Sequence, residues 1–149
     1  MRPISVLQAA ILLAGLAGSA VGMTGRALEK AKEVDAKCRA ETGAGEGSFG
    51  KFVAGAIEVD DQVFKCFIKC IMNELAALDH AGTFNLEEEL LNVPPEVKEE
   101  GHRIVTACQH TKGADPCDTA YQLHKCYHDA NPELYNRVLS VWDFNAGVS

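Results

Sequence analysis

The sequence predicts an exported all-α domain held together by three disulfide bonds. Apolar residues recur at steps of three and four, and no stretch alternates apolar and polar residues long enough for a strand. The chain has six cysteines, an even number that is high for 149 residues. Its start has the features of a secretory signal peptide, and export leads to an oxidising compartment where disulfides persist.

Residues 1–22 are interpreted as the signal peptide. Arg2 supplies a positive charge, Ile4–Ala17 is almost wholly apolar, and small residues follow. Cleavage is expected after Gly22, with Ala20 as the alternative, which leaves residues 23–149 as one helical domain. The alternative of an uncleaved membrane anchor is disfavoured, because the apolar run is shorter than the ~20 residues of a spanning helix. No membrane span is expected after cleavage.

The charge balance excludes one class of partner. The chain has 14 Lys and Arg against 21 Asp and Glu, a net charge of −7. A nucleic-acid binder needs a basic surface to meet phosphates, so none is expected here. Charged residues make up 23%, as in ordinary globular proteins, so composition does not predict disorder.

The order of helices follows from caps, breakers and periodicity. A first helix is expected from a cap at Thr24 to about Ala40, and a glycine-rich loop at Thr42–Gly50 follows it. After these come a short helix at Phe49–Ile57, a long amphipathic helix at Val59–Leu78, and a short helix from a cap at Asn85 through Leu91 with its leucines inward. Pro94 and Pro95 begin a helix to about Gln109, Pro116 one to about Asp129, and Asn131-Pro132 the last one, to Ser140.

The long helix at Val59–Leu78 is expected to cross the centre of the fold, because its apolar stripe is wide. Cys66 and Cys70 lie one turn apart on it. Two cysteines in that relation are badly oriented to bond each other, so each should reach a different partner. Metal binding is the alternative use of cysteines, but no CxxC pair is present and export favours disulfides.

The cysteine spacing resembles that of a known family. The gaps are 27, 3, 37, 8 and 8 residues, and KCFIKCIM at 65–72, LDHAGTFNLEEELL at 78–91 and CYHDANPELY at 126–135 surround the cysteines. The chain resembles insect odorant-binding proteins, the pheromone and general odorant-binding family, over its whole mature length. That resemblance implies about six helices around a buried apolar cavity, stapled by three interlocked disulfides. It also implies the pairs Cys38–Cys70, Cys66–Cys117 and Cys108–Cys126.

The resemblance further implies that some apolar residues contact a small hydrophobic ligand rather than only fill a core. Composition alone fits either role. The candidate ligand-binding residues are Val63, Phe64, Phe67, Ile68, Ile71, Met72, Leu75, Val105, Leu123, Tyr127, Trp142 and Phe144. The tail with Trp142 and Phe144 is expected to fold over the cavity mouth, as in similar family members.

No constellation of residues indicates an enzyme, and no cofactor or metal is expected. His124 and His128 have a spacing that allows a shared metal, but no glutamate accompanies them as in HExxH, and a surface pair is favoured. Glu87–Glu89 is interpreted as a solvated helix face whose position in the first turn suits the helix dipole.

The sequence is therefore interpreted as a secreted carrier of odorants, pheromones or similar semiochemicals. The alternatives are a non-olfactory lipid or hormone carrier and a secreted protein-interaction factor. Further candidate partners are an olfactory receptor and a second copy of the chain. Weaker binding at mildly acidic pH is also expected, with His102 or His124 favoured as the sensor because each lies on a helix that should face the core.

Overall fold

A computed structural model of the protein describes residues 25–57 and 60–140, and within them it is all-α. The only β feature in these ranges is an isolated bridge between Leu78 and Phe84, and no helix there could cross a membrane. The all-α prediction is confirmed. The elements are α2 (Gly25–Thr42), α3 (Ser48–Val53), α4 (Gln62–Glu74), α5 (Leu86–Asn92), the 3-10 helix η1 (Pro95–Val97), α6 (Lys98–Cys108), α7 (Pro116–Ala130) and α8 (Pro132–Leu139).

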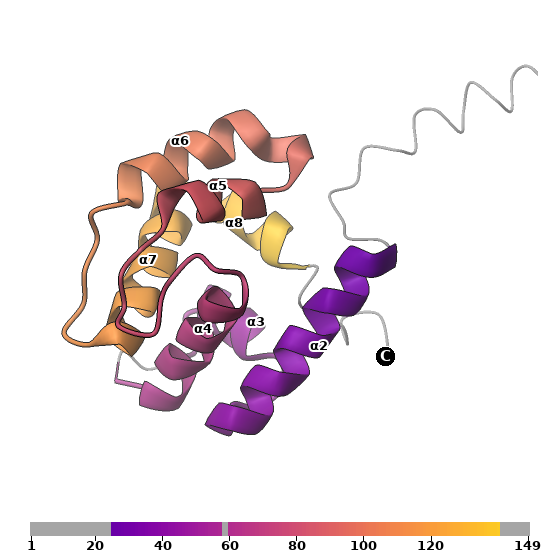
Figure 1. The fold of residues 1–149 in the computed structure, drawn as a ribbon, viewed down its shortest axis with the longest axis vertical. Helices are drawn as coiled ribbons and strands as arrows, with labels where there is room; N and C mark the ends of the chain where they lie inside the picture. Colours follow the sequence, from indigo (N-terminus) through magenta and orange to yellow (C-terminus); the bar gives the residue numbers. More distant parts are fainter. Residues whose placement is uncertain (1–24, 58–59, 141–149) are drawn as a thin grey trace, which may run out of the picture.

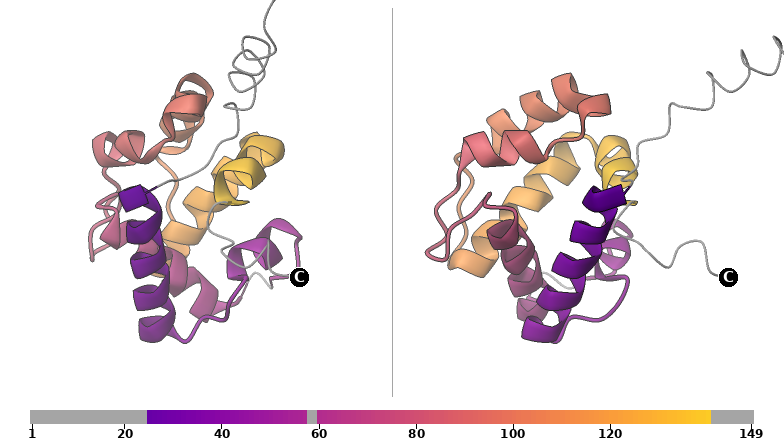
Figure 2. Two further views of the ribbon diagram at one scale, coloured as in Figure 1. Left: turned by 90° about the vertical axis from the view of Figure 1, so that its right-hand side faces the viewer. Right: turned by 45° about the vertical axis from the view of Figure 1, so that its right-hand side comes forward.

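Helix α4 lies at the centre, as predicted. It packs against α7 on one side and α2 on the other (Figures 1 and 2). The pair α5 and α6 lies over one end of this layer, and α8 returns beside α7. Phe64, Phe67 and Ile68 of α4 are all at most 2% exposed. The centre of the molecule is therefore tightly packed along α4 and α7.

Short polar side chains begin four of the helices. Asp61, Asn85, Asp115 and Asn131 each accept a hydrogen bond from a backbone N–H of the first turn, and proline follows directly in α7 and α8. Such caps satisfy donors that the helix itself leaves unpaired. The predicted caps at Asn85 and Asn131 and the predicted start at Pro116 are confirmed.

The cap of α5 offers a test. Asn85→Ala removes the side-chain oxygen that accepts from the N–H of Glu88 at 3.3 Å. We expect the free energy of unfolding to fall by about 1 kcal/mol, measured by urea denaturation. Asn85→Asp keeps an acceptor and is the matched control. Equal losses in both variants would show that the cap does not stabilise α5.

The predicted helix at Val59–Leu78 is too long at its C-terminal end. Helix α4 ends at Glu74, because Ala76 adopts a left-handed backbone with φ of 60°. The Asn73 amide then donates to the carbonyls of Leu78 and Asp79, at 2.7 and 3.0 Å, and holds the reversed chain. Apolar periodicity continued through this turn because Ala77 and Leu78 are buried beneath it.

Other boundaries differ by smaller amounts. Helix α2 continues two residues past Ala40, and α3 begins at Ser48 and ends at Val53, before the predicted Ile57. Residues 95–97 form η1 before α6 begins at Lys98, so the expected single helix from Pro94 is two elements.

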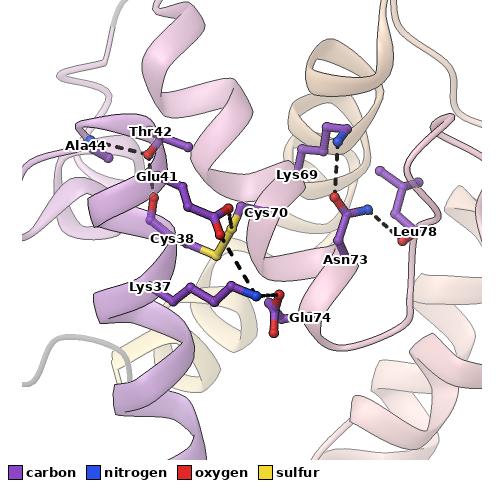
Figure 3. The surroundings of a disulfide bond; sticks show 10 residues. All are labelled: Lys37, Cys38, Glu41, Thr42, Ala44, Lys69, Cys70, Asn73, Glu74 and Leu78. Carbon is purple, nitrogen blue, oxygen red and sulfur yellow. Dashed lines mark hydrogen bonds and ion pairs between the residues drawn. A yellow bond between two sulfur atoms is a disulfide. The ribbon is translucent and has the colours of Figure 1, made fainter.

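Three disulfides each join two different helices. They link Cys38 to Cys70, Cys66 to Cys117, and Cys108 to Cys126, the pairs that the resemblance implies. Figure 3 shows the first of them, between α2 and α4, beside an ion pair of Lys37 with Glu74. Since α4 carries two bridges, to α2 and to α7, the central layer is cross-linked on both sides.

Candidate ligand cavity

A cavity of about 580 Å³ lies between helices α5, α6 and α8 and the C-terminal end of α4. All seven described α-helices contribute to its wall, which is mainly aliphatic and aromatic. Its size lies within the roughly 300–1,000 Å³ of typical small-molecule sites. The principal aliphatic residues are Ile71 and Met72 of α4, Leu75 directly after it, Ile104 and Val105 of α6, and Leu134, Val138 and Leu139 of α8.

The predicted ligand-binding residues divide into four groups. Ile71, Met72, Leu75, Val105 and Tyr127 line the cavity. Four others lie in the packed core and do not line it: Phe64, Phe67, Ile68 and Leu123. Val63 lies in the first turn of α4 and is 47% exposed, away from the cavity. Trp142 and Phe144 lie outside the described residues.

This division has a simple geometric cause. Helix α4 is buried on more than one side, since α7 and α2 cover its flanks while only its C-terminal half reaches the cavity. The spacing of apolar residues identifies the buried positions of a helix. It does not show whether a buried side chain packs against other side chains or borders a cavity.

Leu91 marks the edge of the cavity. It belongs to the lining but is 78% exposed, so the prediction that it faces inward is wrong. It lies in the last turn of α5, a helix in which no residue is fully buried. An exposed leucine at a cavity edge leaves apolar surface where a hydrophobic ligand would pass.

His124 is the one histidine in the cavity lining among the described residues. Its Nδ1 atom shares a 2.8 Å hydrogen bond with the hydroxyl of Tyr135. Burial lowers the pKa of His124 to about 4, so the ring stays neutral at mildly acidic pH. His128 instead faces Asp129, at 3.2 Å, and His102 bonds the Leu90 carbonyl.

Neither His102 nor His124 therefore fits the predicted role of pH sensor, and the reasons differ. His124 is in the right place but titrates too low to gain charge between pH 7 and 5. His102 is not part of the cavity wall.

Glu89 is the cavity group that does titrate near neutral pH. Burial raises its pKa to about 7, although the hydrogen bond from Asn92 and the nearby Tyr127 hydroxyl act in the opposite direction. The interpretation of Glu87–Glu89 as a solvated face is wrong for Glu89, which lines the cavity, and holds for the exposed Glu87. Helical spacing explains this, because Glu89 shares a face with Leu86 and Val93.

Two tyrosines complete the polar end of the cavity. The Tyr127 hydroxyl is buried and has no hydrogen-bond partner within ordinary geometry. The pKa values of Tyr127 and Tyr135 are raised well above their usual range. Burial is the main cause, and the nearby Glu89 carboxylate adds to it. Sequence reasoning named Tyr127 but missed Glu89 and Tyr135. Helical spacing could have indicated both residues. Glu89 follows Leu86 by three residues and Tyr135 follows Asn131 by four, so each shares a helix face with that residue.

The comparisons with known proteins agree with this geometry. The model of the PBP/GOBP family matches residues 23–130. The chain belongs to the PBP/GOBP family. Within it, the general odorant-binding protein 69a of Drosophila melanogaster is 31% identical over 104 residues, 70% of each chain.

Solved structures of odorant-binding proteins share the fold. The lmigOBP1 structure from Locusta migratoria is 49% identical, with a TM-score of 0.74 over 83% of this chain and 95% of that one. Odorant binding protein 7 of Anopheles gambiae, solved with an azo compound, is 29% identical, with a TM-score of 0.63 over 78% and 94%. These PBP/GOBP relatives are carriers rather than enzymes, and family and fold together support a small-ligand carrier role.

Proposed function

We propose that this protein binds odorants, pheromones or similar small apolar semiochemicals in the cavity beside α4 and carries them through extracellular fluid. The observation that carries the proposal is the cavity itself, with its aliphatic and aromatic wall and few polar groups. Apolar surface removed from water contributes about 25 cal/mol per Å², which suits ligands with little polarity. The three disulfides support the cavity, because they stabilise a fold that lacks packing contacts where the cavity lies.

A volume-filling variant tests the site. Ile71→Trp places a large ring at the cavity wall, so we expect the affinity for the apolar fluorophore N-phenyl-1-naphthylamine to fall at least about tenfold. The readout is fluorescence titration, and circular dichroism checks that the helices are intact.

Val63→Trp is the matched control, since it adds the same side chain to an exposed position on the same helix. It should leave affinity unchanged. Equal affinities of the wild type and a folded Ile71→Trp variant would contradict the proposed site.

The extracellular setting follows from the predicted signal peptide. Residues 1–22 lie outside the described residues, so secretion and the cleavage site after Gly22 stay predictions. Expression in insect cells followed by mass spectrometry of the medium tests them, and a mature chain beginning at Met23 is expected. A receptor and a second copy of the chain also stay predicted partners.

A further inference from the structure

The cavity contains an acidic group without a basic partner. Glu89 forms no ion pair with any basic side chain in residues 25–57 and 60–140. An isolated carboxylate next to apolar surface is costly unless it takes up a proton or meets a cation. Lys30 lines the same cavity but forms no ion pair with Glu89, so the counter-charge at this carboxylate is left for a ligand to supply.

Two hydrogen-bond donors near Glu89 offset part of the cost of its charged form. The Asn92 amide donates to Oε2 of Glu89 at 3.3 Å. The Tyr127 hydroxyl, 7% exposed for the whole residue and without a hydrogen-bond partner, lies in the field of the same carboxylate. Both groups are donors, and donors stabilise a carboxylate rather than a carboxylic acid. The carboxylate is thus arranged as an acceptor and lacks only a counter-charge.

Aromatic rings lie around the same end of the cavity. Phe49, Tyr127 and Tyr135 all belong to the lining, and the faces of such rings attract cations. The net charge of −7 adds a long-range attraction for positively charged molecules. A neutral alcohol or hydrocarbon would use neither feature.

We propose that Glu89 is a specificity-determining residue that selects ligands with a protonated amine on a small apolar body. The proposal rests on the proposed carrier function and names a ligand class for the same cavity. The ammonium group would bind the Glu89 carboxylate beside Tyr127, and the apolar body would lie against Ile71 and Val105. Ligands without a charged amine bind by burial alone.

The proposal also predicts a pH dependence. Glu89 shares the cavity with Lys30 of α2, Glu96 of η1, His124 and Tyr127 of α7 and Tyr135 of α8, while α6 presents His102 to the carbonyl of Leu90. Of these groups, His124 and the two tyrosines stay neutral from pH 8 to 5.5, because burial lowers the pKa of the first and raises the pKa values of the others. Glu89, with its pKa raised by burial to about 7, takes up a proton in that range. Amine binding should therefore weaken as the pH falls.

The experiment compares three probes of one length: octylamine, 1-octanol and nonane. Each displaces N-phenyl-1-naphthylamine from the full mature chain at pH 8 and at pH 5.5. We expect octylamine to bind at least about tenfold more tightly than octanol at pH 8, and to lose most of that advantage at pH 5.5.

Glu89→Gln keeps the size of the side chain and removes its charge, so it should weaken octylamine binding far more than octanol binding and abolish the preference for octylamine. Glu87→Gln makes the same change at an exposed position of the same helix and should change nothing. Equal affinities for octylamine and octanol in the wild type, or equal losses for both in Glu89→Gln, would overturn the amine selectivity and leave the carrier function standing. Failure of the fluorophore and of every probe to bind would overturn both.

Discussion

Replacement of Cys66 and Cys117 by alanine is expected to lower the free energy of unfolding by about 4 kcal/mol. This bridge spans 51 residues of sequence and joins the two helices with the most extensive contact, α4 and α7. In the chain-entropy model, a cross-link stabilises by restricting the unfolded chain, and a longer loop gives a larger effect. Urea denaturation followed by circular dichroism measures the loss.

The bridge between Cys108 and Cys126 is the matched comparison. It spans 18 residues, so its double alanine variant should lose about 3 kcal/mol. An equal or larger loss in this second variant would show that native-state contacts, rather than loop length, set the contribution of each disulfide.

His124 should make the protein less stable in acid. Burial lowers the pKa of its imidazole to about 4 from the ordinary 6.5, so the folded state resists protonation. This stabilisation is fully present above pH 6.5 and is lost as pH falls towards 4, by up to about 3 kcal/mol. The difference in unfolding free energy between the wild type and His124→Gln should shrink by that amount between pH 7 and pH 4.

The stability contribution of Glu89 should change with pH in the opposite direction to that of His124. Burial raises its pKa to about 7, so the folded state holds the proton more tightly than the unfolded chain does. This contribution is present below about pH 4.5 and is lost as pH rises through 7. The advantage of the wild type over Glu89→Gln should therefore shrink on raising the pH. Flat differences for both variants would contradict the burial of these two groups in the cavity.

The sequence predicted the framework better than the wall of the cavity. Caps, prolines and apolar spacing are local signals, so the helices begun by Asn85, Pro116 and Asn131 could be placed from the sequence. The left-handed turn at Ala76 has no such signal, because alanine favours helix and its neighbours continue the apolar pattern. The helix was therefore predicted to run past Glu74.

The cavity residues were harder to predict for a physical reason. Phe67 and Ile71 have the same apolar character on the same helix, yet only Ile71 borders empty space. Glu89 is one of three consecutive glutamates, and the sequence does not distinguish it from Glu87. Only its position on the cavity-facing side of α5 does so. Whether a buried side chain meets protein or a cavity depends on the arrangement of all the helices, which no local pattern encodes.

A small apolar ligand is expected to bind between α4, α6 and α8. Nuclear magnetic resonance can locate this ligand through nuclear Overhauser contacts between unlabelled 1-octanol and isotope-labelled methyl groups of the full mature chain. Contacts to the methyl groups of Ile71, Met72 and Val105, and none to the exposed Val63, are the predicted result. Saturable binding with contacts only to surface methyl groups such as those of Val63 would rule out binding in this cavity.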